Sequence, residues 1–242
     1  MVEWFKDWFN SPYYHILYKH RDDAEASAFI DRVLDFLQPP PDGRFLDVAC
    51  GKGRHSIYLN SKGYDVTGID ISPNSIKVAS EHTNTRLRFQ VADMRKPFAD
   101  AEYHYALNLF TSFGYFDDRN DNLLSLQNIY AALKPGGFFV LDYFNAEKVL
   151  KMLPIKESKV IDEIEFRICK YLDNKRIVKT IEFTDEGHTY GFTEKVEAAY
   201  KADFERLFDK TDFVIKHIFG SYKLEEFNDT HSDRLIFVAQ KP

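Results

Sequence analysis

The 242-residue sequence predicts one α/β domain built on a doubly wound, mostly parallel seven-stranded sheet, into which an antiparallel β-meander is inserted. Short apolar runs alternate with helical patterns between residues 44 and 144, which is typical of parallel βαβ units. Strand-like runs follow one another without helices between residues 158 and 198. The last stretch returns to one helix and two strands, as a closing antiparallel hairpin of the main sheet would.

The first half of the chain opens with a helix over residues 24–37, where apolar residues recur at helical spacing until three prolines end it. RFLDVA (44–49) predicts a buried strand, and a glycine turn leads into a helix that ends near Gly63. DVTGID (65–70) is a second strand. Ser72 and Pro73 then provide an N-cap and a first-turn proline for a helix reaching about His82.

Three further elements complete the parallel part of the sheet. LRFQVAD (87–93) and YHYALNLF (103–110) predict the third and fourth strands. The next helix carries Leu123, Leu126, Tyr130 and Leu133 on one face, and KPGG (134–137) breaks it. FFVLDYF (138–144) is the fifth strand.

The remaining elements define the domain organisation. Three strand-like runs, 159–172, 176–184 and 188–200, are joined by the hairpin sequences DNK and DEG, and a helix (201–210) precedes strands at 213–222 and 234–240. We expect an N-terminal helical lid (1–38), a ligand-binding core (39–157), inserted strands (158–198) and a closing helix and hairpin (199–242). The inserted strands are expected either to wall the acceptor pocket or to pair with a second copy in a homodimer.

Composition and charge narrow the class of protein. The chain is 44% hydrophobic and 29% charged, with a formal net charge of −6 and no run of Lys or Arg typical of a nucleic-acid footprint. Two cysteines, Cys50 and Cys169, make no disulfide framework, and no apolar stretch is long enough to span a bilayer. We therefore expect a cytoplasmic protein without a membrane or nucleic-acid partner.

Aspartates stand at the ends of the first three strands, at positions 47, 70 and 93, spaced 23 residues apart. One such residue could simply cap a helix, but three in step gather at the ligand edge of a doubly wound sheet. Asp47, just before the glycine turn, would oppose a pyrophosphate and suits a ligand with an ammonium or sulfonium group. Asp70 can accept both hydroxyls of a ribose, and Asp93 can accept from an adenine amine.

These features describe a cationic nucleoside, S-adenosylmethionine, better than a dinucleotide. The dinucleotide alternative depends on Gly51, Gly53 and Ser56, which approximate G-x-G-x-x-G with serine for the last glycine. Asp47 and Asp93 count against it.

Five segments resemble, in order and spacing, the motifs of class I S-adenosylmethionine-dependent methyltransferases. They are FLDVACGKGRHS (45–56), VTGIDIS (66–72), VADMR (91–95), LNLFTSFGYF (107–116) and LKPGGFFVLD (133–142). The resemblance covers residues 42–145 and extends more loosely to the closing helix and strands. It implies the Rossmann-like methyltransferase fold and S-adenosylmethionine as cofactor.

The resemblance also implies a cofactor role for each matching residue. The methionine portion is lined by Asp47, Ala49, Gly51 and Gly53. Asp70 holds the ribose, and the adenine contacts are Ile71, Ala92, Asp93 and Met94. Asn108, Leu109 and Phe110 lie beneath the sulfonium. Two positions depart from the family: Ala49 replaces its first glycine, and Asp212-Phe213 stands where a glycine precedes the aromatic of the sixth strand.

The acceptor is expected to be a small molecule, methylated at N, O or C by direct displacement. Methyltransferases that act on nucleobase amines resemble one another in a short Asn/Asp-Pro-Pro-aromatic motif after the fourth strand, and NLFTSF at this position has no prolines. Cytosine C5 enzymes need a nucleophilic cysteine there, and neither cysteine of this chain is at that end. This stretch is most similar to small-molecule methyltransferases, sugar N-methyltransferases among them. RNA or protein methylation and a catalytically silent S-adenosylmethionine-binding partner subunit remain as alternatives. A closed aromatic cavity would favour small molecules, and an open basic groove would favour polymers.

Acceptor-side and catalytic candidates come from three places. In the aromatic N-terminal segment, Trp4 and Trp8 lie four residues apart on one helical face, and so do Tyr14 and Tyr18. Tyr18 and Arg21 are assigned to the cofactor, and Tyr14 is assigned to the substrate. Tyr115 and Asn145 could orient an acceptor, and Asp142 could act as a base, so these three are the catalytic candidates. The histidines show no metal-ligand spacing, and no metal is expected.

Overall fold

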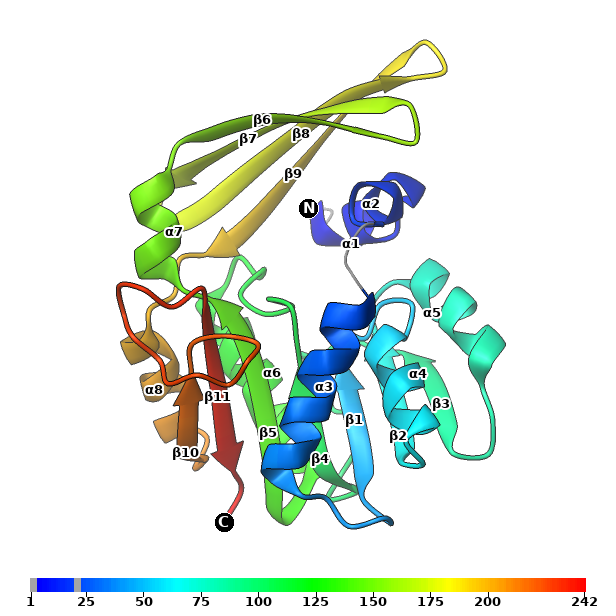
Figure 1. Cartoon of the computed structure of the whole chain (residues 1–242), viewed down its shortest axis with the longest axis vertical. Coiled ribbons are helices and arrows are strands. Elements are labelled where there is room, and N and C mark those ends of the chain that lie inside the picture. Colours follow the sequence, from blue (N-terminus) through cyan, green and yellow to red (C-terminus); the bar gives the residue numbers. More distant parts are fainter. Residues whose placement is uncertain (1–3, 20–22) are drawn as a thin grey trace.

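Two sheets, one above the other, form the molecule, and the N-terminal helices lie between them (Figure 1). The computed structural model describes residues 4–19 and 23–242. The larger, seven-stranded sheet is the expected α/β core, and the smaller is a four-stranded antiparallel sheet that follows helix α7 (Ala146–Met152). The predicted fold class is confirmed.

The main sheet has the strand order β10-β11-β5-β4-β1-β2-β3. Its strands β1 to β5 are parallel, while β11 is antiparallel to both of its neighbours, as predicted for a closing hairpin. The strands are β1 (Arg44–Val48), β2 (Asp65–Asp70), β3 (Leu87–Val91), β4 (Tyr103–Asn108), β5 (Leu133–Phe144), β10 (Val214–Phe219) and β11 (Arg234–Gln240). The order reverses between β1 and β4, which is where such sheets bind ligands.

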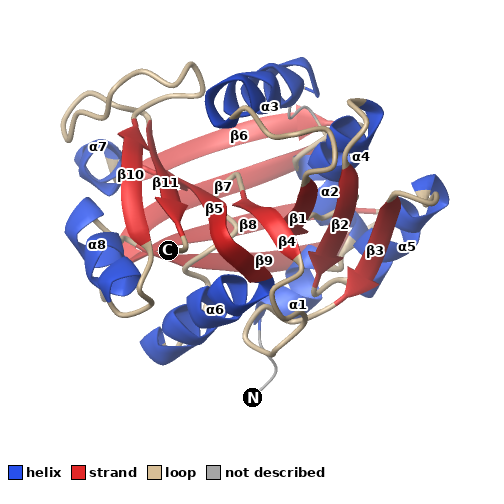
Figure 2. Cartoon of the chain, turned by 90° about the horizontal axis from the view of Figure 1, so that it is seen from below, coloured by secondary structure: helices blue, strands red, loops and turns tan. Residues whose placement is uncertain are grey.

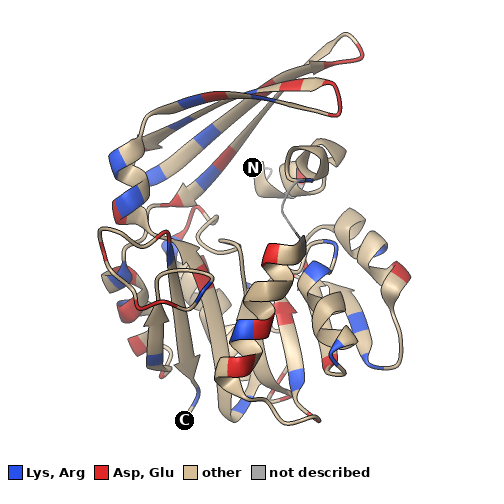
Figure 3. Cartoon of the chain, viewed as in Figure 1, with Lys and Arg blue, Asp and Glu red and all other residues tan. Residues whose placement is uncertain are grey.

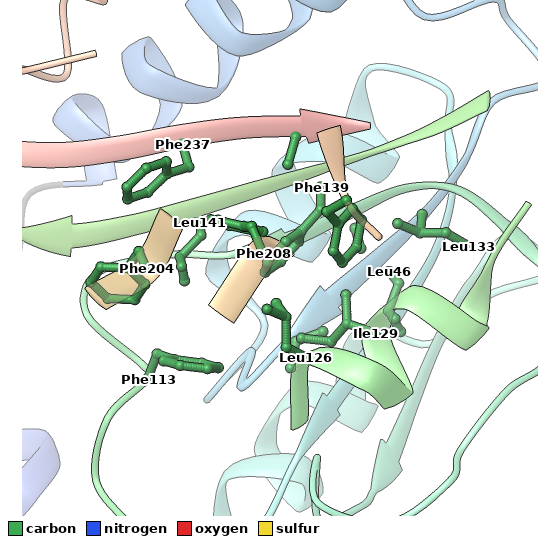
Figure 4. Close-up of a cluster of buried hydrophobic side chains, with 14 of the residues drawn as sticks. Leu46, Phe113, Leu126, Ile129, Leu133, Phe139, Leu141, Phe204, Phe208 and Phe237 are labelled. Carbon is green, nitrogen blue, oxygen red and sulfur yellow. The ribbon is translucent and has the colours of Figure 1, made fainter. Parts of the chain in front are cut away.

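Helices cover both faces of this sheet (Figure 2). On one face, α3 and α4 supply Phe29, Ile30 and Leu59 to a buried cluster. On the other, α6 and α8 contribute Leu126 and Phe208 to the cluster drawn in Figure 4. The helices of the core are α3 (Asp23–Leu37), α4 (Arg54–Ser61), α5 (Pro73–Ala79), the 3-10 helix η1 (Ser80–His82), α6 (Arg119–Ala132) and α8 (Lys201–Asp209). Both apolar faces of the sheet are thereby removed from water.

The start of α5 and the end of α6 test two predictions about where helices begin and end. Ser72 accepts a hydrogen bond from the Ser75 amide at 3.1 Å, so it is the N-cap of α5 as predicted. Leu133, expected on a helix face, is instead the first residue of β5, because α6 ends at Ala132 and the chain enters the sheet before KPGG rather than after it. Its side chain is still buried in the core.

The inserted meander has four strands, not the three expected. They are β6 (Ile155–Ile161), β7 (Ile164–Asp173), β8 (Arg176–Asp185) and β9 (His188–Glu197). The run read as one strand over 159–172 reverses at Asp162-Glu163, which joins β6 to β7 as a two-residue turn. Both residues have positive φ, 47° and 67°, the conformation of a type I′ hairpin. No glycine marks this turn, so the residue types gave no signal for it.

The N-terminal segment folds as two short helices, α1 (Trp4–Phe9) and α2 (Pro12–Leu17). Trp8 and Leu17 are buried against Phe166 and Phe183 on the underside of the four-stranded sheet. Helix α3, which the sequence analysis grouped with this lid, packs on the main sheet. Among the described residues, no helix has the length and apolar character needed to cross a membrane.

Candidate active site

The glycine turn after β1 forms the floor of the candidate site. Ala49 has a φ of 60°, so this residue adopts the left-handed conformation of the glycine that it replaces. Gly53 begins α4 with a φ of 82°, and a Cβ atom there would lie 2.6 Å from the Phe89 ring. At the second position that departs from the family, Asp212 has a φ of 58°, so it also adopts the left-handed conformation of the glycine expected there. Both non-glycine positions therefore preserve the backbone path.

Asp70, at the end of β2, has its carboxylate anchored by the backbone on both oxygens. The amide of Gly51 donates to Oδ2 and the amide of Ser72 donates to Oδ1, each at 2.8 Å. Burial raises the pKa of this carboxyl, while the hydrogen bonds from Ser72 and Gly51 act in the opposite direction. The carboxylate lines the cavity described below. Its remaining lone pairs can accept ligand hydroxyls.

Asp47 lies behind the glycine turn and does not line the cavity. It is 1% exposed and accepts a 2.6 Å hydrogen bond from the Ser56 hydroxyl at the start of α4. Burial raises the pKa of the Asp47 carboxyl from 3.8 to about 7, against the Ser56 hydrogen bond, which lowers it. This residue therefore ties β1 to α4, and the ligand contact implied by the family resemblance is not formed by its side chain.

The raised pKa of Asp47 predicts a pH-dependent stability. The Asp47 carboxyl keeps its proton up to about pH 7 in the folded protein, whereas it loses that proton near pH 3.8 in the unfolded chain. The contribution of this group to folding stability is therefore fully present below pH 3.8 and is lost as the pH rises to about 7. Relative to Asp47→Asn, the wild-type free energy of unfolding should fall by roughly 2–3 kcal/mol between pH 5 and 8. Urea unfolding of both proteins measures this; an equal gap at the two pH values would contradict it.

Asp93, after β3, is held in an ion pair. Its carboxylate accepts from Arg95 Nη2 at 2.7 Å and from Arg95 Nε at 3.0 Å, and Arg95 also bridges to Asp121 at 3.0 Å. The Arg95 guanidinium lies over the rings of Phe5 and Phe116. Asp93 lines the cavity, but the Arg95 guanidinium compensates its charge. The expectation of a cationic nucleoside therefore depends mainly on Asp70.

A first cavity, of about 930 Å³ including its open mouth, lies over the ends of β1, β2 and β4 beneath α1 and α2. Ala49, Gly51 and Asp70 line one side, together with Ile71, Ala92 and Met94, as the resemblance implies. The rest of the wall is strongly aromatic: Phe5, Phe9, Tyr14, Tyr18, Phe110, Phe113, Tyr115 and Phe116. The site is thus a covered, largely aromatic cavity whose lining includes the carboxylates of Asp70, Asp93 and Glu194.

Three residues assigned to the cofactor lie below the cavity wall. Gly53 is not among the lining residues, and Leu109 is buried in the core. Asn108 is fully buried, and its Nδ2 donates to the carbonyl oxygens of Val48 at 3.1 Å and Ser112 at 3.3 Å. Asn108 therefore links the loops after β1 and β4, which support the ligand-facing residues above them.

A second cavity, of about 1020 Å³ with its open mouth, lies between the four-stranded sheet and the main sheet. Tyr18, Phe110, Tyr115 and Glu194 line both cavities. We call this set the junction. Its members come from α2's C-terminus, the loop after β4 and strand β9, so segments far apart in sequence meet at one point.

Glu194 is the junction residue that the sequence reasoning missed. Its Oε1 accepts from Trp8 Nε1 at 2.7 Å and from the Tyr18 hydroxyl at 2.6 Å, and its Oε2 lies 3.6 Å from Lys179 Nζ. The side chain is only 14% exposed. A signal did exist: strand alternation places Glu194 on the same face as the aromatic Phe192, an unusual position for a carboxylate.

Of the catalytic candidates, Tyr115 lies at the junction, and Asp142 does not reach it. Tyr115 packs edge-on against Trp4 and Phe9. Asp142 is 0% exposed and accepts from the Phe110 amide at 2.7 Å and from Arg234 Nε at 2.8 Å. Its role is to hold the turn at Phe110, which has a positive φ of 57°.

Asn145 is also placed away from both cavities, which corrects its assignment as a substrate and catalytic candidate. It is the N-cap of α7, where its Oδ1 accepts from the Glu147 amide at 3.1 Å. Its Nδ2 donates to the carbonyl oxygens of Asp229 and Ser232, so it fastens the loop before β11. All of its side-chain polar atoms are used structurally.

The N-terminal assignments divide. Tyr14 and Tyr18 line the first cavity from α2 and its C-cap, so both reach the site. Arg21 lies outside the described residues. Within residues 4–19 and 23–242, no group of three His, Cys, Asp or Glu side chains is arranged to hold a metal ion.

Comparisons with known proteins give a consistent result. A family model described as a methyltransferase domain matches residues 45–137. The chain is 27% identical over 238 residues to YqeM of Bacillus subtilis (strain 168), a protein named as a methyltransferase; the match covers 91% of this chain and 94% of that protein.

Two further similarities concern enzymes whose acceptors are named. The chain is 34% identical over 134 residues to a glycine/sarcosine N-methyltransferase of Parasynechococcus marenigrum (strain WH8102), covering 53% of this chain and 48% of that enzyme. Its fold is similar to that of CalS10, an amino pentose methyltransferase from Micromonospora echinaspora solved with S-adenosylmethionine bound. The TM-score is 0.72 at 18% identity, covering 96% of this chain and 98% of CalS10.

Proposed function

Because this chain is a class I S-adenosylmethionine-dependent methyltransferase, we propose that it methylates a small molecule held in the second cavity. The observation that carries the proposal is the junction of Tyr18, Phe110, Tyr115 and Glu194, whose residues line both the cofactor-side cavity and the second one. A methyl group must pass directly from donor to nucleophile, so the two ligands have to meet at a shared point. The junction provides one.

The residues of the first cavity fit the cofactor S-adenosylmethionine. Asp70 offers carboxylate oxygens to the ribose, and Ile71 and Met94 offer apolar surface to the adenine. The backbone of Ala49 and Gly51 leaves room for the methionine portion, since neither carries a bulky side chain. When bound, the cofactor supplies an electrophilic methyl group on a positively charged sulfur. The surrounding aromatic rings tolerate that charge and keep water away.

A small acceptor is supported by how the site is covered. Helices α1 and α2 lie over the first cavity, and the four-stranded sheet roofs the second (Figure 1). Polymer substrates need an open groove with basic walls, whereas the cavity on the cofactor side is lined mainly by aromatic rings and lies beneath α1 and α2. The acceptors named for the glycine/sarcosine and amino pentose enzymes are small amines, which supports a nitrogen nucleophile.

Glu194 is the proposed proton acceptor. In the displacement, the nucleophile forms a bond to the methyl carbon as the carbon–sulfur bond breaks, and a proton must leave the nucleophile. Glu194 is the carboxylate at the junction, and Trp8, Tyr18 and Lys179 fix its position. These contacts orient the carboxylate toward the shared space without a rearrangement.

A transfer assay tests the proposed function. The purified protein is incubated with methyl-labelled S-adenosylmethionine and a cell extract, which is then separated into small molecules, RNA and protein. We expect the label in the small-molecule fraction. Label in RNA or protein, or no transfer to any fraction, would contradict the proposal and would support the polymer-modifying or silent-subunit alternative, respectively.

A further inference from the structure

Building on the proposed function, we infer that the small-molecule acceptor carries an acidic group, a carboxylate or a phosphate, which the second cavity binds at a distance from the junction. Six charged side chains line this cavity: Glu157, Lys159, Lys170, Lys179, Glu194 and Arg234. Four are cations and two are carboxylates. The chain as a whole is acidic, with a net charge of −6, so this lining reverses the overall sign.

Of the four cations, Lys179 contacts the junction through the Tyr18 hydroxyl and the Glu194 carboxylate, whereas Lys159 and Lys170 pair with Glu157. None of the four lines the first cavity, whereas Glu194 lines both. At the junction the charge of Lys179 is compensated by Glu194, so the positive charge available to an acidic group comes from Lys159 and Lys170, which share Glu157. An acceptor with its nucleophile at one end and an acidic group at the other matches this polarity.

The four-stranded sheet is built with two different halves on its inner surface. Toward the hairpin tips, Phe166 and Phe183 pack against α1 and α2. Toward α7, the inward positions of the same strands are charged, with Lys170 on β7 and Lys179 on β8. Figure 3 shows Lys and Arg along these strands above the main sheet. Helices α1 and α2 explain the apolar half, and the charged half lines the second cavity.

Three carboxylates, Glu157, Glu194 and Asp142, face the four cations, so one positive charge remains in excess. Glu157 is shared by Lys170 at 3.0 Å and Lys159 at 3.5 Å, so one carboxylate faces two lysines. Arg234 bonds to Asp142 at 2.8 Å and lies over the Tyr222 ring. Preorganised cations of this kind bind an anion with little loss of side-chain entropy.

The chemical nature of the product tests the inference. The labelled small molecule from the transfer assay is purified and weighed by mass spectrometry before and after two treatments. Esterification in acidic methanol reveals a carboxylate, and alkaline phosphatase reveals a phosphate ester. We expect one of them to change the mass. A labelled small molecule that responds to neither treatment overturns the inference while leaving the proposed function intact; label in a polymer overturns both.

Two isosteric substitutions with opposite expected signs test the cation cluster. Lys170→Gln should raise the KM for the acidic acceptor about tenfold, because a charged hydrogen-bond donor is lost. Glu157→Gln should lower that KM, since it releases two lysines from their carboxylate. Lys156→Gln, on the exposed outer face of β6, is the matched control and should change nothing.

Cofactor affinity, measured by calorimetry, should be the same in all three variants, which separates acceptor binding from folding. If Lys170 and Glu157 serve only to stabilise the sheet, both substitutions would raise KM or reduce stability together. That outcome, or an unchanged KM for Lys170→Gln, would overturn the role of these residues.

Discussion

Asp70→Ala is expected to weaken S-adenosylmethionine binding by about 10- to 150-fold, which corresponds to roughly 1.5–3 kcal/mol for hydrogen bonds to a charged group. The carboxylate is held by the amides of Gly51 and Ser72, so its free lone pairs are fixed before the ligand arrives. Its removal eliminates both the ribose contact and the anchor of the glycine turn. Isothermal titration calorimetry with the cofactor measures the change in Kd.

The matched control is Asp65→Ala, which removes an aspartate from the opposite end of the same strand. Asp65 pairs with Arg44 and Arg88 on the far edge of the sheet and lines neither cavity. Its removal should leave the cofactor Kd within about twofold, because solvent-exposed ion pairs contribute little. Equal affinities of the two variants for the cofactor would disprove the assignment of Asp70.

Glu194→Gln should lower kcat by about 10²- to 10⁴-fold, the usual contribution of a positioned general base. Glutamine keeps the size of the side chain and can still accept from Trp8 and Tyr18, but it loses both the proton-accepting charge and the ion pair with Lys179. The cofactor Kd should stay nearly constant, since Asp70 and the glycine turn are untouched. Single-turnover transfer to the acceptor found in the labelling assay is the measurement.

Glu182→Gln is the corresponding control, an exposed glutamate on the outer face of neighbouring strand β8. Its kcat should equal that of the wild type. If Glu194→Gln also retained kcat within about threefold, the proton would have to leave by another route, and Glu194 would have a purely structural role.

Much of the main sheet was predictable because periodicity and turn chemistry agree along it. Ser72 and Pro73 mark the start of α5, and the alternation of apolar strands with helices specifies parallel βαβ units. The closing antiparallel hairpin also follows from the loss of helices between its strands. These signals are local, so a single sequence contains them.

The missed turn at Asp162-Glu163 shows where local signals fail. Two non-glycine residues adopt positive φ there; aspartate tolerates this conformation, but the glycine that usually follows it in such a turn is replaced by Glu163. The surrounding apolar alternation continues through the turn, so the run reads as one strand. Pairing of β6 with β7 and burial of Phe166 against the N-terminal helices decide the reversal, and both are tertiary effects.

The residues of the candidate site show the same difference between local and tertiary signals. Asp70 and the glycine turn were found because their positions follow from strand ends, which a sequence displays. Asp142, near the end of β5, and Asn145, just after it, are placed in the same way, yet Arg234 and the loop before β11 engage them structurally. Glu194 was missed because its position depends on an inserted sheet folding over the core, and that approach is not encoded in any short stretch.

We propose that the cofactor and the acceptor meet at Tyr18, Phe110, Tyr115 and Glu194, which line both cavities. A crystal structure of the protein with S-adenosylmethionine tests it most directly, because the direction of the sulfonium methyl group can be seen. We expect the ribose of the cofactor to contact Asp70 and its sulfonium methyl group to point through the junction into the second cavity. A methyl group that points away from Glu194 into another opening would contradict it.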